Sequence, residues 1–180
     1  RSGGQYASLS DETERLDPDV FEQAEVGLKW DFAAGLSFTA AYFQNEQTRT
    51  TRDPATDQSF ETRGLEVDGF ELQLQGPVTD RWSVSAGYSN LSGETSTGAQ
   101  PHELPEHTFS IWNAVDLTDR FGFGIGATYQ DDSLISDGSN LVLPAYTRLD
   151  ASAYYEISDD LYVQLNVENL TDETYFPSAH

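Results

Sequence analysis

The chain has 180 residues, no Cys, and nine Lys and Arg residues against 31 Asp and Glu residues, a formal net charge of −22. This acidity argues against nucleic acid as a partner, because phosphate binding needs basic surfaces. The absence of Cys excludes disulfides, thiolate metal sites and Cys nucleophiles, and no apolar run approaches the roughly 18–20 residues of a membrane helix.

From residue 21 onward, segments of about ten residues alternate apolar and polar side chains, which is the period of a β-strand. The clearest segment is 121–130, where Phe121, Phe123 and Ile125 alternate with glycines. In chain order the predicted strands are residues 21–32, 36–47, 65–75, 82–91, 108–117, 121–130, 147–157 and 161–167.

The third segment, residues 65–75, changes phase along its length. Leu65 and Val67 are out of register with Phe70 and Leu72, so we predict a β-bulge near Gly69.

The breaks between segments alternate in length. Residues 33–35, 76–81, 118–120 and 158–160 are short, whereas 48–64, 92–107 and 131–146 are long. In an antiparallel meander this alternation places tight turns at one end and long loops at the other, as in bacterial outer-membrane barrels. Segments of this length also suit tilted membrane strands of about 9–11 residues better than soluble strands of about 5–6.

The predicted fold class is therefore all-β, with about eight antiparallel up-and-down strands of a transmembrane β-barrel. A soluble acidic β-barrel binding module remains an alternative, because it shows the same alternation with the apolar face inside. In the membrane interpretation the apolar face points to lipid: Phe109, Ile111, Val115, Phe121, Phe123, Ile125, Leu149 and Leu165. The opposite face would line the lumen: Gln73, Ser85, Asp150, Tyr154 and Gln164.

Aromatic residues gather near the segment ends, as two interfacial girdles would require. Those beside the short turns are Trp30, Phe32, Trp82, Phe121 and Tyr162. Those toward the long loops are Tyr42, Tyr88, Tyr129 and Tyr175.

Four stretches resemble, in order, the barrel of TonB-dependent siderophore receptors. FEQAEVGLKWDF is similar to the family's E-x-G-x-K strand, and GFELQLQGPVTDRWSVSAGYS to its G-[FV]-E…W…Y hairpin. LPEHTFSIWNAVDL is similar to the P-x-H-x-x-x-x-W strand. LPAYTRLDASAYYEISDDLYVQLNVENLTDETYF resembles the ending P-x-Y-x-x-x-D…N-L-x-[DN]-x-x-Y.

This resemblance implies a barrel of about 22 strands around an N-terminal plug. Residues 1–180 would form part of that barrel, without the plug, the TonB box or the final strand. It further implies the outer membrane of a Gram-negative bacterium, with lipid and lipopolysaccharide around the wall and TonB acting through the plug. The implied function is active import of a ferric siderophore, with cobalamin, a glycan or an aromatic metabolite as alternative cargo.

The sequence contains no G-x-S-x-G, H-E-x-x-H or P-loop motif, so we expect no enzyme, catalytic residue or cofactor. His102 and His107 lie in a predicted loop and do not indicate a metal site. Asp150 and Glu168 could be a general acid and base, but in a barrel they favour a lumen network with Arg148. A loop rich in carboxylates could bind calcium or simply be solvated: Asp131, Asp132, Asp137 and Asn140.

Ligand contacts in such a receptor would come from the long loops and the upper lumen, from aromatic and Arg side chains. The candidates are Arg49, Arg52, Arg63, Tyr42, Tyr88, Tyr129 and Tyr146. Girdle or loop scaffolding is the alternative for each of them. The three arginines form the only basic cluster in a predicted extracellular loop, where an anionic siderophore would need positive potential.

The chain is also predicted not to close on itself, because the family's curvature suits a much wider cylinder. The segments 21–32 and 161–167 would then be edges with unpaired backbone groups.

Overall fold

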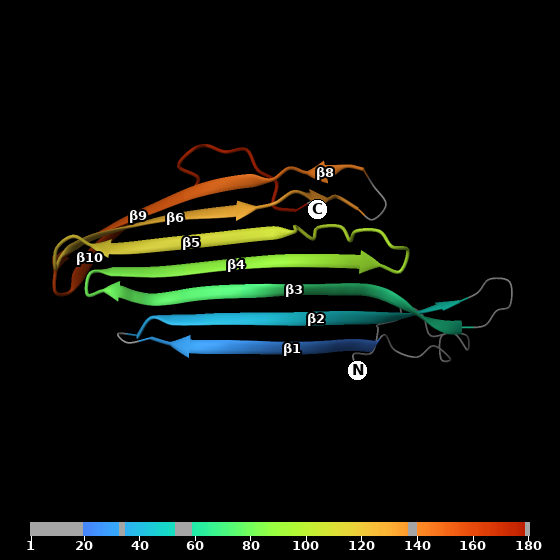
Figure 1. The fold of residues 1–180 in the computed structure, drawn as a ribbon. Helices are drawn as coiled ribbons and strands as arrows, with labels where there is room; N and C mark the ends of the chain where they lie inside the picture. The colour runs from blue at the N-terminus through green and yellow to red at the C-terminus, as the bar shows by residue number, and fades with distance from the viewer. Residues whose placement is uncertain (1–19, 33–34, 53–58, 137–139, 179–180) are drawn as a thin grey trace.

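The computed structural model describes residues 20–32, 35–52, 59–136 and 140–178. Eight strands form one sheet in the order β1-β2-β3-β4-β5-β6-β9-β10 (Figure 1). Their bounds are β1 Val20–Asp31, β2 Ser37–Arg52, β3 Ser59–Thr79, β4 Trp82–Thr95, β5 His107–Asp116, β6 Phe121–Gln130, β9 Tyr146–Ser158 and β10 Leu161–Val167. A small hairpin of β7 (Ser133–Leu134) and β8 (Val142–Leu143) lies between β6 and β9.

Every neighbouring pair in the sheet is antiparallel, so the predicted all-β meander is confirmed. Figure 1 shows the tight turns after β3, β5 and β9 at one end and the long connections at the other. We call these the turn end and the loop end. Among the described residues, no helix is long and apolar enough to cross a membrane.

The register sorts side chains into two faces. Tyr88, Phe109 and Tyr129 pair across β4, β5 and β6, and so do Gly87, Ser110 and Thr128 on the opposite face. The first set belongs to the predicted apolar face and the second to the predicted polar face. Both faces therefore keep the alternation that the sequence predicts, because side chains in paired strands point the same way.

The apolar face has no second layer to cover it within the described part of the chain. The buried hydrophobic residues there are Val84, 8% exposed, and Leu143, 7% exposed. By contrast Ile125 and Leu165 are 49% and 63% exposed. The described strands therefore do not pack these side chains inside a closed barrel, which is the arrangement that the soluble alternative requires.

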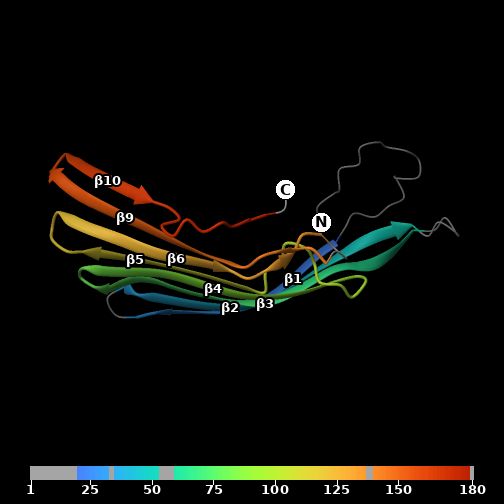
Figure 2. The same ribbon diagram turned by 90° about the horizontal axis from the view of Figure 1, so that it is seen from above.

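The sheet is curved, and the segment after β10 lies on its concave side (Figure 2). That segment contacts Tyr146 and Arg148, which belong to the polar face. The polar face is therefore the concave one, as a barrel lumen requires. β1 and β10 are the two ends of the sheet order, so the described strands form an open sheet, as predicted.

The bulge predicted near Gly69 is wrong. Both ladders of β3 continue without a shift there, and the shifts lie at Gln47/Thr48 and Pro77/Thr79 instead. Leu65 and Val67 are simply apolar residues on the concave face at the loop end. Gly69 serves close packing, because a Cβ atom there would approach Leu91 Cδ2 to 2.8 Å.

The long break predicted at 48–64 is also largely wrong. β2 continues to Arg52 and β3 begins at Ser59, so the two strands extend past their neighbours at the loop end. The extended end of β2 is rich in Thr, a residue type that favours strands. Apolar and polar side chains do not alternate there, so the sequence pattern did not reveal the strand.

The two other loops contact each other. The backbone N–H of Glu103 donates to the carbonyl of Leu134 over 2.9 Å, which joins the 96–106 loop to the β7–β8 hairpin. Ser133 is buried at this junction, with 3% exposure, and its hydroxyl has no hydrogen-bond partner among the described residues. The 96–106 loop and the β7–β8 hairpin are thus in direct contact at the loop end of the sheet.

Candidate functional site

The loop end of the concave face carries an aromatic and cationic cluster. Tyr146 begins β9 and stacks on Tyr175 of the segment after β10, with ring centroids 4.7 Å apart. Arg148, two residues along the same face, donates from Nη1 to the Tyr175 hydroxyl over 3.1 Å. The guanidinium carbon lies 5.7 Å from the Tyr175 ring centroid. The Tyr175 ring therefore contacts both an aromatic stacking partner and a cation.

Asp150 fixes the orientation of the Arg148 guanidinium. Its Oδ2 accepts from Arg148 Nε and Nη2 at 3.1 and 3.0 Å. Its Oδ1 accepts from the backbone N–H of Asn169 at 2.8 Å. The predicted lumen pairing of Asp150 with Arg148 is confirmed, and the network joins β9 to the turn that follows β10. The part of that prediction that concerns Glu168 stays a prediction.

A shallow hollow adjoins this cluster. It has a volume of about 450 Å³, and residues of both faces line it. Those of the concave face carry mostly hydroxyl and amide groups, including Gln73, Ser89 and Gln130, together with the carboxylate of Glu71. Gln130 also accepts a hydrogen bond from the Tyr146 hydroxyl over 3.4 Å. The hollow and the aromatic cluster are therefore one continuous surface, able to hydrogen-bond a polar molecule and to stack on an aromatic group.

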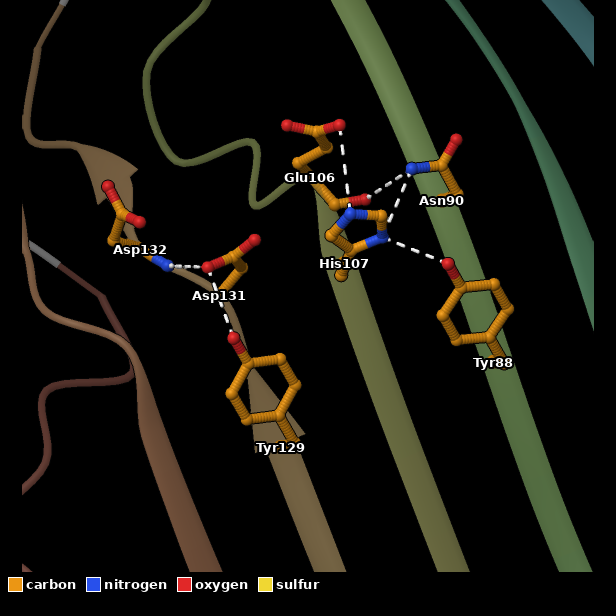
Figure 3. Close-up of polar contacts among 7 residues, drawn as sticks. All are labelled: Tyr88, Asn90, Glu106, His107, Tyr129, Asp131 and Asp132. Carbon is orange, nitrogen blue, oxygen red and sulfur yellow. Dashed lines mark hydrogen bonds and ion pairs between the residues drawn. The ribbon is translucent and has the colours of Figure 1, made fainter.

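A second cluster lies on the apolar face at the same end (Figure 3). With its proton on Nε2, His107 accepts at Nδ1 from the Tyr88 hydroxyl over 2.9 Å and from the Asn90 amide over 3.1 Å. Its Nε2 lies 3.7 Å from a Glu106 carboxylate oxygen. Tyr129 nearby donates to Asp131 over 3.2 Å. Aromatic rings with polar partners at the edge of an apolar band are typical of an interfacial girdle.

The structure separates the four candidate tyrosines. Tyr42, Tyr88 and Tyr129 lie on the apolar face, because the register aligns them with Phe70 and Phe109. This placement favours the girdle alternative for these three. Tyr146 lies on the concave face beside the hollow.

The three candidate arginines lie in strands rather than in a loop, which corrects the predicted position. Arg49 and Arg52 are near the end of β2, and Arg63 is near the start of β3. Arg49 pairs with Thr62, and Thr48 pairs with Arg63. Their side chains lie outside what the structure describes.

Two residues of the concave cluster were missed as ligand candidates, namely Arg148 and Tyr175. Arg148 could have been found from the spacing Tyr146, Arg148, Asp150, which places three functional groups on one strand face. Tyr175 could not have been found from the sequence, because it reaches Tyr146 only through the turn at Asn169, whose φ is 54°.

No metal centre is formed by the described residues, where no group of three His, Asp or Glu side chains is placed to hold an ion. Asp137, one of the four residues of the carboxylate-rich loop, lies outside the described residues.

Known proteins resemble this chain in sequence and in fold. A family model described as "TonB dependent receptor-like, beta-barrel" matches residues 2–170. The probable TonB-dependent siderophore receptor PiuA of Acinetobacter baumannii is 31% identical over 198 residues, which cover 99% of this chain and 26% of that protein.

Two solved structures share the fold. The ferric-catecholate import receptor Fiu of Escherichia coli K12 has a TM-score of 0.72 at 27% identity, over 89% of this chain and 23% of its own. FpvA of Pseudomonas aeruginosa, bound to a ferric pyoverdine, has a TM-score of 0.81 at 25% identity, over 97% of this chain and 26% of its own.

The chain thus spans about a quarter of the length of these relatives. The family consists of transporter receptors rather than enzymes, and its members are outer-membrane β-barrel proteins of Gram-negative bacteria. Since the family model covers most of the sequence and the solved structures share its antiparallel sheet, the chain belongs to the TonB-dependent receptor β-barrel family.

Proposed function

We propose that this chain is a wall segment of an outer-membrane TonB-dependent receptor that imports a ferric siderophore. The observation that carries the proposal is the likeness, over 99% of the chain, to a probable siderophore receptor. The remaining barrel strands and a plug would belong to the same receptor. TonB would act through the plug, and lipid with lipopolysaccharide would surround the wall.

The division of the sheet into two faces supports this role physically. The apolar face, ending in the cluster around Tyr88 and His107, suits contact with lipid tails and their polar boundary. The concave face offers hydroxyl and amide groups along the hollow, with Tyr146 at its loop end. Such a surface can guide a bulky polar chelate through many exchangeable hydrogen bonds without binding it too tightly at one point.

The three arginines remain candidates for attracting an anionic chelate. Arg49, Arg52 and Arg63 are positioned near the loop-end termini of β2 and β3, which extend beyond the neighbouring strands. These 180 residues carry a formal charge of −22, so within this segment a local positive potential would have to come from such a cluster.

The proposal is tested by expressing the intact receptor in a Gram-negative strain that lacks its own siderophore receptors. We expect uptake of radioactive iron from at least one ferric siderophore, and loss of that uptake when TonB is deleted. Iron uptake that persists without TonB contradicts the transport mechanism. A receptor that reaches the outer membrane but takes up no iron chelate contradicts the cargo.

Replacing the three arginines together by Ser separates their role from that of the barrel. If they attract an anionic cargo, the triple variant shows a raised half-saturating concentration with an unchanged maximal rate. Identical uptake curves for the variant and the parent would show that the three arginines serve only as scaffolding.

A further inference from the structure

The indole ring of Trp112 lies flat on the concave face of β6. A Cβ atom at Gly124 would come within 2.8 Å of Cζ2 and Cε2 of the ring, and one at Gly126 within 3.0 Å of Cε3 and Cζ3. These atoms form opposite edges of the six-membered ring, so the ring spans two positions along β6 although Trp112 belongs to β5. Both directions lie in the sheet. One face of the indole therefore rests on the β6 backbone, and the other points into the concave space.

A second hollow, of about 370 Å³, opens beside this ring at the turn end of the concave face. Trp112 lines it together with Ser85, Gln75 and Ser37, and each of these residues pairs with the next across β5, β4, β3 and β2. None of the described residues that line it carries a charged side chain. This turn-end hollow is therefore a neutral space with polar groups on one side and an aromatic ring on the other.

The polar groups around the turn-end hollow have unused hydrogen-bonding capacity. Within the described part of the chain, neither the indole N–H of Trp112 nor the hydroxyls of Ser37 and Ser85 have a hydrogen-bond partner. Gln75 accepts from Gln73 Nε2 over 3.4 Å, which leaves its own amide N–H groups available. A molecule in the hollow therefore meets both donors and acceptors beside the exposed face of the indole.

The turn-end hollow lies directly below the hollow that adjoins the aromatic cluster. Ser110 of β5 lines the first hollow, and Trp112 takes the next concave position of that strand. In β4 the same step leads from Gly87 to Ser85. Each step covers about 7 Å and runs toward the turn end (Figure 1). A molecule that leaves the first hollow along this wall toward the turn end therefore meets Trp112 next.

We propose that Trp112 and the turn-end hollow form an intermediate binding site for an aromatic ring of the cargo, which the ring reaches after the first hollow. The inference rests on the function proposed above. The indole face stacks on the ring, while the Trp112 N–H, Ser85 and Gln75 bond its hydroxyl or amide substituents. A ring is favoured over an ionic group because no lining side chain supplies a counter-charge.

An intermediate site changes the rate of passage and not the affinity for cargo bound from outside. It divides the path into two shorter steps, and conduction through such a path is faster than through one long step. Trp112→Leu should therefore leave the dissociation constant of the chelate unchanged in cells without TonB. Its turnover per receptor should fall about two- to tenfold in cells with TonB, because one stacked aromatic pair is lost. Trp112→Phe keeps a ring and should retain most of the turnover.

The experiment measures uptake of radioactive iron from the ferric complex of 2,3-dihydroxybenzoate by cells that express the intact receptor. Dividing the rate by the binding capacity in the cold gives turnover per surface receptor, which a loss of folded receptor does not change. Trp82→Leu is the matched control, because Trp82 lies on the apolar face and donates to Asn113 Oδ1 over 3.1 Å. Unchanged or raised turnover of Trp112→Leu overturns the proposal, and so does an equal loss in Trp82→Leu.

A second variant tests the hollow with the indole in place. Ser85→Leu fills the turn-end hollow from the strand beside Trp112, so it should lower turnover as Trp112→Leu does, and this variant decides the question if Trp112→Leu does not reach the outer membrane. Turnover equal to that of the parent overturns the proposal.

The ring is tested with a ferric trihydroxamate that has no aromatic group. Trp112→Leu should slow its import much less than import of the aromatic chelate. Equal losses for both chelates, or import of the trihydroxamate alone by the parent, overturn the aromatic site while the proposed import of iron stands. A parent receptor that takes up no iron chelate overturns the proposed function and this inference together.

Discussion

At the scale of single residues, the junction of the two loops contains an unusual group. Ser133 is buried and its hydroxyl has no hydrogen-bond partner among the described residues. Burying an unpaired hydroxyl costs roughly 1–3 kcal/mol.

We therefore predict that Ser133→Ala leaves the β7–β8 hairpin as stable as before, or more stable by up to about 1 kcal/mol. The measurement is the rate of limited proteolysis in the 131–145 loop of the intact receptor. Faster cleavage of the Ala variant would mean that the hydroxyl has a stabilising partner after all.

A second residue-scale feature explains two of the glycines of β6. Trp112 of β5 lies on the concave face against Gly124 and Gly126, where a Cβ atom would clash with the indole ring. The glycines are thus needed for the close approach of a large ring, and not for backbone freedom.

Replacing Gly124 by Ala should destabilise the intact barrel by about 1–3 kcal/mol, because the added Cβ atom would lie 2.3 Å from Trp112 Cζ2 and the indole would have to shift. The destabilisation should shrink in a Trp112→Ala background, since the two sites are coupled. The free energy of unfolding in urea, measured in lipid vesicles for the double-mutant cycle, checks this. Additive effects of the two substitutions would refute the coupling.

At the scale of elements, the sequence predicted most strands but not every boundary. β6 and β10 match their predicted ranges, 121–130 and 161–167, because apolar alternation runs to both ends. The loop-end extensions of β2 and β3 were missed, since Thr and charged residues pair there without an apolar face. The contact of Tyr146 with Tyr175 was missed because it depends on a turn and not on strand period.

The two faces of a single strand should respond oppositely to charge. Ala86 and Ser85 are adjacent in β4, on the apolar and the concave face respectively. Ala86→Lys should cost about 2–4 kcal/mol of folding free energy in a bilayer, because the ammonium group would enter lipid. Ser85→Lys should cost far less, as it faces the lumen. Equal costs, measured by urea titration in vesicles, would contradict the assignment of faces.

At the scale of the whole molecule, the described strands form an open sheet whose apolar face is uncovered. β1 and β10 present unpaired backbone groups at its two ends. A sheet with such edges and such a face is a template for self-association in water.

The isolated chain should therefore aggregate in detergent-free buffer, and form smaller particles when detergent covers the apolar face. Light scattering with and without detergent is the measurement. A monodisperse monomer without detergent would favour the soluble-barrel alternative.

The central claim is that the apolar face of this wall meets lipid and the concave face meets the lumen. Spin labels placed one at a time along β4 of the intact receptor in vesicles test it most directly. The account predicts the highest accessibility to oxygen, which concentrates in lipid, at Trp82, Ala86 and Tyr88, and lower values at Ser83, Ser85 and Gly87. Oxygen accessibility that peaks at the second set, or that shows no alternation, would contradict it.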